Sequence, residues 1–228
     1  MTEPISIDIW SDIACPWCYI GKRNLEKGLE AFSADEDAPQ VTITLHSFEL
    51  SPDTPIDFDG DEIDFLAGHK GMPRAQVEQM LSHVADTAAA AGLEYRFDLL
   101  QHTNTVKAHE LLHFAKAQGM QREMAERLMS AYFTEGRHVG RIDDLVELAA
   151  EAGLNAVEAR ESLESELYLP AVRQDQEQAR AYGIQGVPFF VIDGQYGISG
   201  AQPPAAFENV LREVWSKRGE DETEPATV

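Results

Sequence analysis

The only two cysteines of this chain of 228 residues, Cys15 and Cys18, stand three positions apart. Thiol-disulfide exchange needs a thiolate that attacks a disulfide and a second thiol close enough to resolve the mixed disulfide. The run Cys15-Pro16-Trp17-Cys18 can supply both if Cys15 begins a helix. At that position free backbone N–H groups and the positive end of the helix dipole favour an ionised sulfur. The spacing therefore predicts redox chemistry.

Each residue of this run has an expected place. Pro16 suits the first helical position, because its missing N–H is no loss there. Cys18 lies one turn on and is expected to be the partly buried resolving thiol, with Cys15 the exposed nucleophile. Trp17 can add an apolar lip on which a substrate backbone rests, or serve structure alone. A zinc site or an inert pair is less favoured, because zinc needs four ligands and there is no second cysteine pair.

The elements on both sides of the cysteines follow from the spacing of apolar residues. Alternation over residues 5–9 predicts a strand, and a helical period begins at Pro16. A second alternating run, 41–45, should pair beside the first strand, with the helix as a right-handed crossover. Residues 51–64 are rich in Pro, Asp and Gly, which is typical of a connection.

A long helical stretch follows. From 73 to 182 the apolar spacing predicts four to six helices, with stripes such as Val77, Leu81 and Val84 in their core. Glycines are expected at the helix ends, at Gly92, Gly119, Gly136 and Gly153.

The end of the chain returns to strands. Residues 187–192 predict a strand, and Asp193-Gly194 predicts a two-residue hairpin turn into 195–199. A last helix should begin at Pro203-Pro204 and bury one apolar face, formed by Phe207, Val210, Leu211 and Val214.

The fold class is therefore α/β, with the order β-α-β … β-β-α interrupted by an all-helical insertion. We expect the first part of the split domain over 1–60, the insertion over 61–182 and the second part over 183–218. Residues 219–228 are acidic and are expected to be disordered.

Composition narrows the partners. Asp and Glu outnumber Lys and Arg by 40 to 18, a formal charge of −22, which disfavours nucleic acid and anionic membranes. Neither a signal peptide nor an apolar run of about 20 residues is visible, so the cytoplasm is the expected compartment. No metal or organic cofactor is predicted, although glutathione or another small thiol can recycle the dithiol. A monomer and a homodimer both fit.

A competing motif lies in the helical stretch. His109-Glu110-Leu111-Leu112-His113 matches H-E-x-x-H, which on a helix can bind zinc and activate water in a metalloprotease. The third ligand would come from Glu126, Glu135 or His138. A motif this short also arises by chance, and packing or solvated histidines are the simpler interpretation.

Three segments together resemble the DsbA-like family of the thioredoxin superfamily, FrnE-type subgroup. They are Asp12-Ile13-Ala14-Cys15-Pro16-Trp17-Cys18-Tyr19-Ile20-Gly21, Gly186-Val187-Pro188-Phe189-Phe190-Val191 and Ser199-Gly200-Ala201-Gln202. The resemblance spans nearly the whole chain and implies a thioredoxin fold with an inserted helical domain. It also implies a cis bond before Pro188, in a loop that lies against the nucleophilic sulfur. Val187 would offer its backbone N–H and C=O to an extended substrate.

Two departures from the periplasmic members of this family bear on function. Trp17 stands where they carry histidine, so the resemblance implies a potential nearer that of thioredoxin and a reductase or isomerase role. The export signal is also absent. A related class, the kappa glutathione transferases and 2-hydroxychromene-2-carboxylate isomerase, has serine where Cys15 stands, so a small-molecule isomerase or glutathione-dependent transferase stays open. A peptide-binding chaperone is a further alternative, which would keep its activity after Cys15→Ser.

Overall fold

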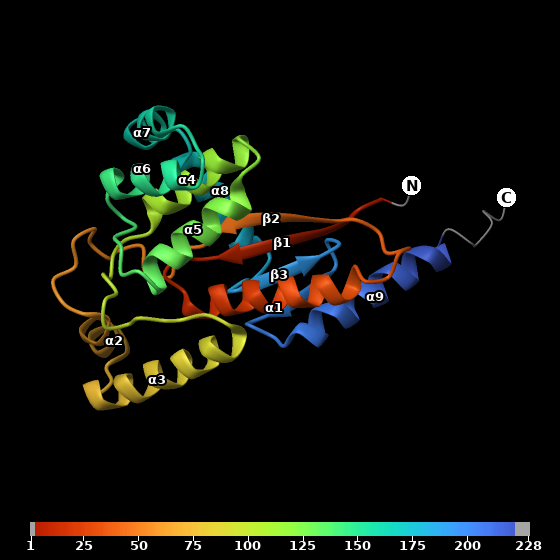
Figure 1. Cartoon of the computed structure of the whole chain (residues 1–228), viewed down its shortest axis with the longest axis horizontal. Coiled ribbons are helices and arrows are strands. Elements are labelled where there is room, and N and C mark those ends of the chain that lie inside the picture. Colours follow the sequence, from red (N-terminus) through yellow and green to blue (C-terminus); the bar gives the residue numbers. More distant parts are fainter. Residues whose placement is uncertain (1–2, 222–228) are drawn as a thin grey trace.

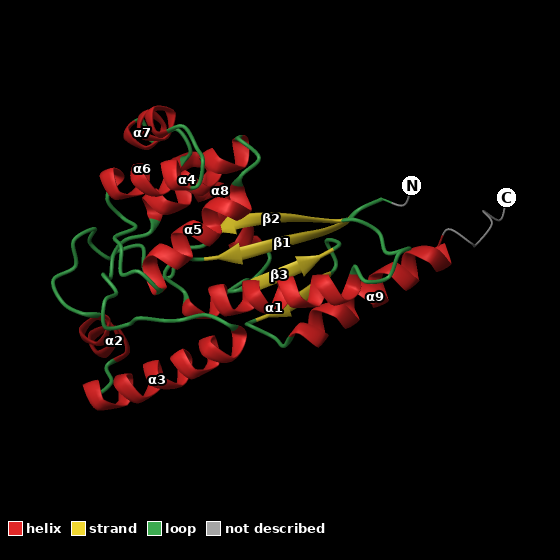
Figure 2. Ribbon diagram, viewed as in Figure 1, coloured by secondary structure: helices red, strands yellow, loops and turns green. Residues whose placement is uncertain are grey.

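The computed structural model describes residues 3–221, and Figures 1 and 2 show a twisted sheet flanked by helices, with further helices gathered at one end. The elements in chain order are β1 (Ile5–Ser11), α1 (Pro16–Phe32), β2 (Val41–Ser47), α2 (Glu62–Lys70), α3 (Arg74–Ala91), α4 (Val106–Ala117), α5 (Gln121–Phe133), α6 (Ile142–Glu151), α7 (Ala156–Glu164), α8 (Leu169–Ala181), β3 (Phe189–Ile192), β4 (Tyr196–Ser199) and α9 (Pro204–Asp221).

The sheet has the strand order β2-β1-β3-β4. β1 pairs in parallel with β2, with Ile5 opposite Val41, and α1 makes the crossover between them. β3 is antiparallel to β1 and to β4. Asp193 and Gly194 turn the β3–β4 hairpin with φ of 55° and 68°, the left-handed conformation that such a two-residue turn requires. The predicted β-α-β unit and the hairpin are both confirmed.

One face of the sheet packs against α1 and α9, which lie side by side along it (Figure 1). Ile5, Ile7 and Ile9 point to this face because alternate residues of a strand share a side. They meet Phe32 of α1 and Phe207 of α9 in one buried cluster. The alternation read from the sequence thus places the first core correctly.

The other face packs against α8. Trp10, fully buried on β1, contacts Ala179 and Ile184 there, and its indole N–H donates to the Asp175 carbonyl over 3.1 Å. The division of the chain at 60, 182 and 218 remains a proposal. The packing of α8 on the sheet favours an insertion that ends before Leu169.

The helices at the end of the sheet include one that the sequence did not predict. The connection expected through residue 64 ends earlier, because α2 begins at Glu62. Asp61 and Asp64 form a capping box at its start, each side chain accepting from the other's backbone N–H. The remaining six helices of 74–181 agree with the expected four to six, and the stripe Val77, Leu81 and Val84 is buried.

α9 extends further than expected. The predicted disordered tail begins at 219, but the helix continues to Asp221, because no proline interrupts the sequence before 225. The rest of that tail, 222–228, lies outside the described residues. Within residues 3–221, none of the helices combines the length and the apolar composition needed to cross a bilayer.

Candidate functional site

Cys15 lies where the sequence predicts it, between the end of β1 and the start of α1. It is the N-cap residue, with extended backbone angles (φ −90°, ψ 111°), and Pro16 follows at the first helical position. Its N–H donates to the Asp12 carbonyl over 3.2 Å, and its carbonyl accepts from the Cys18 N–H over 3.0 Å. The sulfur therefore projects from the amino end of a helix of 17 residues, the end where anions are stabilised.

The expected exposure of the two thiols differs from what the structure shows. Cys15 was expected to be exposed, yet its exposed fraction is 3%, close to the 2% of Cys18. The difference arises because the loop before β3 covers the sulfur: the Cys15 thiol donates to the Val187 carbonyl over 3.5 Å. Trp17, by contrast, lies at the surface with 37% of its area exposed.

Burial acts strongly on the second thiol. Desolvation, and next the neighbouring Cys15, raise the pKa of Cys18 well above its ordinary value, while the Ser11 side chain and the Asp12 backbone act in the opposite direction. Cys18 is therefore a neutral thiol at neutral pH.

The loop that covers Cys15 contains a cis peptide bond between Val187 and Pro188. The Pro188 carbonyl accepts from the Gly200 N–H over 2.8 Å, at the end of the β3–β4 pairing. The Val187 carbonyl instead faces the Cys15 sulfur. Within one loop, the Pro188 carbonyl thus bonds to the sheet and the Val187 carbonyl bonds to the cysteine.

Gly21 explains why α1 can approach this loop. A Cβ atom at Gly21 would lie 3.0 Å from the Pro188 ring and 3.3 Å from the Phe190 ring, which is tighter than ordinary van der Waals contact. Close by, the Asn24 side chain donates to the Gln202 carbonyl over 3.0 Å. The three sequence segments that carry the family resemblance therefore meet at Gly21, with the loop of Val187 and Pro188 reaching from there to Cys15.

Tyr95, in the loop between α3 and α4, is part of this site although the sequence analysis did not single it out. Its hydroxyl donates to the Pro16 carbonyl over 2.7 Å, and its ring lies 4.7 Å from that of Phe133. Burial, and next the proximity of Cys15, raise the pKa of Tyr95. No sequence signal marks this tyrosine, because a single aromatic residue in a connection is common.

The H-E-x-x-H motif on α4 has its side chains directed to separate partners. His109 Nε2 lies 3.3 Å from an Asp12 carboxylate oxygen, and His113 Nε2 lies 3.0 Å from Asp175. Glu110 is buried beside the Lys107 ammonium, 2.9 Å away.

The residues considered as a third zinc ligand lie in other environments. Glu126 pairs with Lys22 over 2.5 Å and Glu135 with Arg127 over 2.5 Å, while His138 hydrogen-bonds the Ile56 carbonyl over 3.0 Å. Over the described range 3–221, no three His, Cys, Asp or Glu side chains converge as metal ligands would. The side chains of the motif are instead bonded to Asp12, Lys107 and Asp175.

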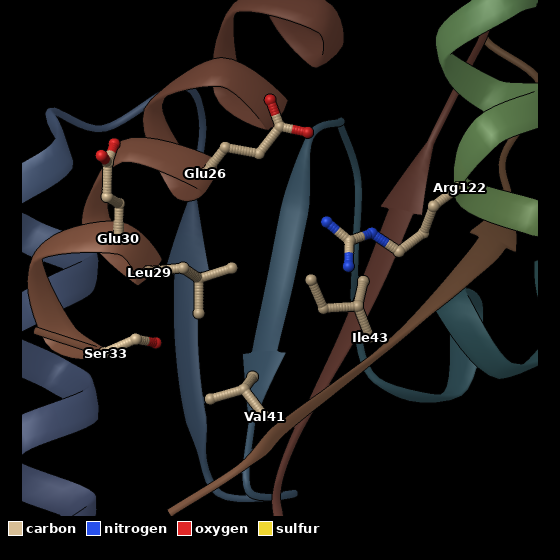
Figure 3. A pocket seen from close by; sticks show the side chains of 7 residues that line it. All are labelled: Glu26, Leu29, Glu30, Ser33, Val41, Ile43 and Arg122. Atoms are coloured by element: carbon tan, nitrogen blue, oxygen red, sulfur yellow. The ribbon is translucent and has the colours of Figure 1, made fainter. Parts of the chain in front are cut away.

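A groove of about 390 Å³ lies elsewhere, between the second half of α1 and the start of β2. Figure 3 shows Leu29, Val41 and Ile43 in it, with Arg122 reaching in from α5. Its nearest α1 residue, Glu26, is eleven positions from Cys15, roughly 16 Å along a helix. It holds no thiol, so the candidate site for redox chemistry is at the cysteines.

Comparison with known proteins agrees with this arrangement. The model of the DSBA-like thioredoxin domain family matches residues 6–212, and the chain belongs to that family. The crystal structure of a probable DsbA oxidoreductase from Streptomyces coelicolor is 38% identical and superposes with a TM-score of 0.87, covering 98% of this chain and 93% of that one.

Two further relatives extend the comparison. YwbO of Bacillus subtilis, an uncharacterised protein, is 29% identical over 218 residues, which cover 94% of this chain and 99% of YwbO. The cytosolic disulfide reductase DsbM of Pseudomonas aeruginosa is 21% identical with a TM-score of 0.64, over 92% of this chain and 98% of DsbM, and shares the fold.

Proposed function

We propose that this protein is a thiol-disulfide oxidoreductase that reduces or isomerises disulfides, with Cys15 as the nucleophile and Cys18 as the resolving thiol. The observation that carries the proposal is the position of Cys15, at the amino end of α1 and against the carbonyl that precedes Pro188. Membership of the DSBA-like family supports it.

The chemistry proceeds in two exchanges. The Cys15 thiolate attacks one sulfur of a substrate disulfide, that S–S bond breaks, and the leaving sulfur takes up a proton from water. Cys18 then loses its proton and attacks the Cys15 sulfur, which forms the Cys15–Cys18 disulfide and releases the second substrate thiol. Two electrons pass from the dithiol to the substrate. Two molecules of glutathione or another small thiol restore the dithiol and become a disulfide themselves.

The residues around the sulfur fit a substrate chain. Val187 would pair its backbone with an extended substrate segment once that segment displaces the thiol from the Val187 carbonyl. Pro188 would keep this loop against Cys15, and the exposed indole of Trp17, next to Pro16, would support the apolar part of the substrate. A disulfide-containing protein or small molecule is therefore the partner we propose.

We further propose that the protein works in the cytoplasm as a reductase. Both cysteines of the chain belong to the one motif, so the fold needs no disulfide of its own and suits a reducing compartment. The residue at position 17 also supports a reductase, because Trp17 stands there in place of a histidine that would stabilise the Cys15 thiolate.

Insulin reduction in the presence of glutathione tests the proposal. We expect turnover by the wild type, background rates for Cys15→Ser, and for Cys18→Ser a covalent complex with substrate that dithiothreitol releases. Cys18→Ser is the matched comparison, because it removes an equally buried thiol three residues away. Equal turnover by wild type and Cys15→Ser would reject the assignment. Suppression of aggregation that survives Cys15→Ser would instead favour a peptide-binding chaperone.

A further inference from the structure

Asp12 is a buried carboxylate within the loop that presents Cys15. Its residue is 1% exposed, and the loop turns here because the Cys15 N–H donates to the Asp12 carbonyl. One carboxylate oxygen accepts from the Ala14 N–H over 3.3 Å, and the other accepts from the Leu50 N–H over 2.8 Å. The side chain thus joins the cysteine loop to the loop that follows β2.

Side chains from the helical insertion complete the surroundings of this carboxylate. His109 is fully buried, and its Nε2 donates to Asp12 over 3.3 Å. His109 lies in the first turn of α4, which begins at Val106 with Thr105 as its N-cap residue. The carboxylate therefore lies near the amino end of α4, where the helix dipole favours negative charge.

The charge on Asp12 depends on these contacts. Burial alone would raise its pKa, but the hydrogen bond and the charge of His109, with the Leu50 N–H and Thr105, hold the pKa below its usual range. A buried carboxylate that loses such a partner must find water or move. Movement of Asp12 would carry the turn at Cys15 with it.

We propose that His109 is a positioning residue for the thiol exchange: from the helical insertion it holds the Asp12 side chain and, through it, the loop that presents Cys15. The role explains the first histidine of the H-E-x-x-H motif, which the redox chemistry does not otherwise use. This positioning role depends on the proposed function only for the insulin-reduction assay, and the alkylation assay tests it independently. In this role the helical insertion fixes the position of the Cys15 sulfur in addition to surrounding it.

His113 provides a matched control on the same helix. It lies four residues after His109, is buried as well, and also pairs with a carboxylate, that of Asp175. Asp175 belongs to α8 and bonds the Ser47 N–H over 2.7 Å, away from the cysteine loop. Loss of His113 should therefore destabilise the fold without moving Cys15.

The test measures the rate at which iodoacetamide alkylates Cys15 as a function of pH, in full chains that carry Cys18→Ser so that Cys15 is the only thiol. The half-plateau pH is the pH at which this rate reaches half of its alkaline plateau. For His109→Leu we expect the half-plateau pH of alkylation to rise by about one unit, because the sulfur is no longer held at the helix end. His109→Gln, which keeps a donor near the Nε2 position, should restore most of the difference. His113→Leu should leave the half-plateau pH within about 0.3 unit of the parent.

Insulin reduction in chains that keep Cys18 gives the second readout. His109→Leu should lower kcat about tenfold or more with little change in KM, as expected for a misplaced nucleophile, while His113→Leu should not. An unchanged half-plateau pH in His109→Leu, or an equal rise in His113→Leu at matched stability, would overturn the positioning role. If the wild type reduces no insulin but the half-plateau pH still rises in His109→Leu, the proposed function fails and the positioning role stands.

Discussion

The two faces of the sheet are built in opposite ways. The face under α1 and α9 is apolar: Ile7, Phe190 and Phe207 pack there in one buried hydrophobic cluster. The face under α8 also carries a buried polar network, beside the apolar cluster of Trp10, Ala179 and Ile184. His46 lies between two carboxylates, 2.8 Å from Asp8 and 2.8 Å from Asp175.

The polar face is nevertheless closely ordered. The indole of Trp10 stacks on the His46 ring with centroids 4.5 Å apart, and donates to the Asp175 carbonyl. The Asp175 carboxylate also meets His113 and the Ser47 N–H. The face under α1 and α9 is held by apolar packing, whereas the face under α8 combines the apolar cluster around Trp10 with a hydrogen-bond network that crosses from the strands to α4 and α8.

The largest effect is expected on the apolar face. Phe207→Ala should lower the free energy of unfolding by about 3–5 kcal/mol, because it leaves a cavity in a closely packed cluster. Phe207 is fully buried, and its ring meets that of Phe190 edge to face at 4.8 Å. Urea denaturation followed by circular dichroism measures the change. A loss under about 1 kcal/mol would show that this face can repack.

The same contrast separates what the sequence could predict from what it could not. Alternation in 5–9 and the face of the last helix are local patterns, so they identify the apolar face directly. The polar face joins His46 to Asp175, 129 positions apart. Each residue alone resembles a solvated one, and only the fold brings them together.

The candidate site shows the same division. The positions of Cys15 and Pro16 follow from local rules for the start of a helix, and the Val187–Pro188 loop was placed by resemblance to a family. Tyr95 and the contact between His109 and Asp12 were not predicted, because both depend on how the insertion docks. The burial of Cys15 was missed for a similar reason, since the loop that covers it comes from 172 positions away.

On the polar face, Asp175→Asn should have the next largest effect. The substitution keeps the shape of the side chain but removes the charge that accepts from two histidines and the Ser47 N–H. We expect a loss of about 1.5–3 kcal/mol, the range for hydrogen bonds to charged groups. Urea denaturation at pH 6 measures it. If Asp175→Asn costs less than about 0.5 kcal/mol, the network orders this face without stabilising it.

The pH dependence of stability should distinguish the faces further. Burial lowers the pKa of His46, but hydrogen bonds to Asp175 and Asp8 outweigh it and raise the pKa above the usual 6.5. Its contribution is therefore complete below about pH 6.5 and is lost as the pH rises through the folded-state pKa. Asp175, whose pKa is lowered, contributes above its unfolded value near 3.8 and loses that contribution in acid.

Unfolding measured from pH 5 to 9 in wild type and His46→Gln tests this sign. The wild type should lose stability on the alkaline side by at most about 1.4 kcal/mol per pH unit, and the variant should lack that part of the slope. His138, whose pKa is lowered by burial and by Arg141, has the opposite sign. The contribution of His138 to the slope is the same in the wild type and in His46→Gln, so it cancels when the two slopes are compared. Identical slopes would mean that folding leaves the pKa of His46 unchanged.

The smallest effect is expected at the rim of the polar face. Asp8 is the second partner of His46, but 34% of its side chain is exposed, against 10% for Asp175. Water already solvates Asp8 and screens its charge, so Asp8→Asn should cost under about 1 kcal/mol. Added salt should reduce even that difference, while the cost of Asp175→Asn should persist because its carboxylate is buried. If Asp8→Asn and Asp175→Asn lower the free energy of unfolding equally at every salt concentration, the exposed and the buried carboxylate do not differ in strength. The network under α8 then does not act mainly through its buried part.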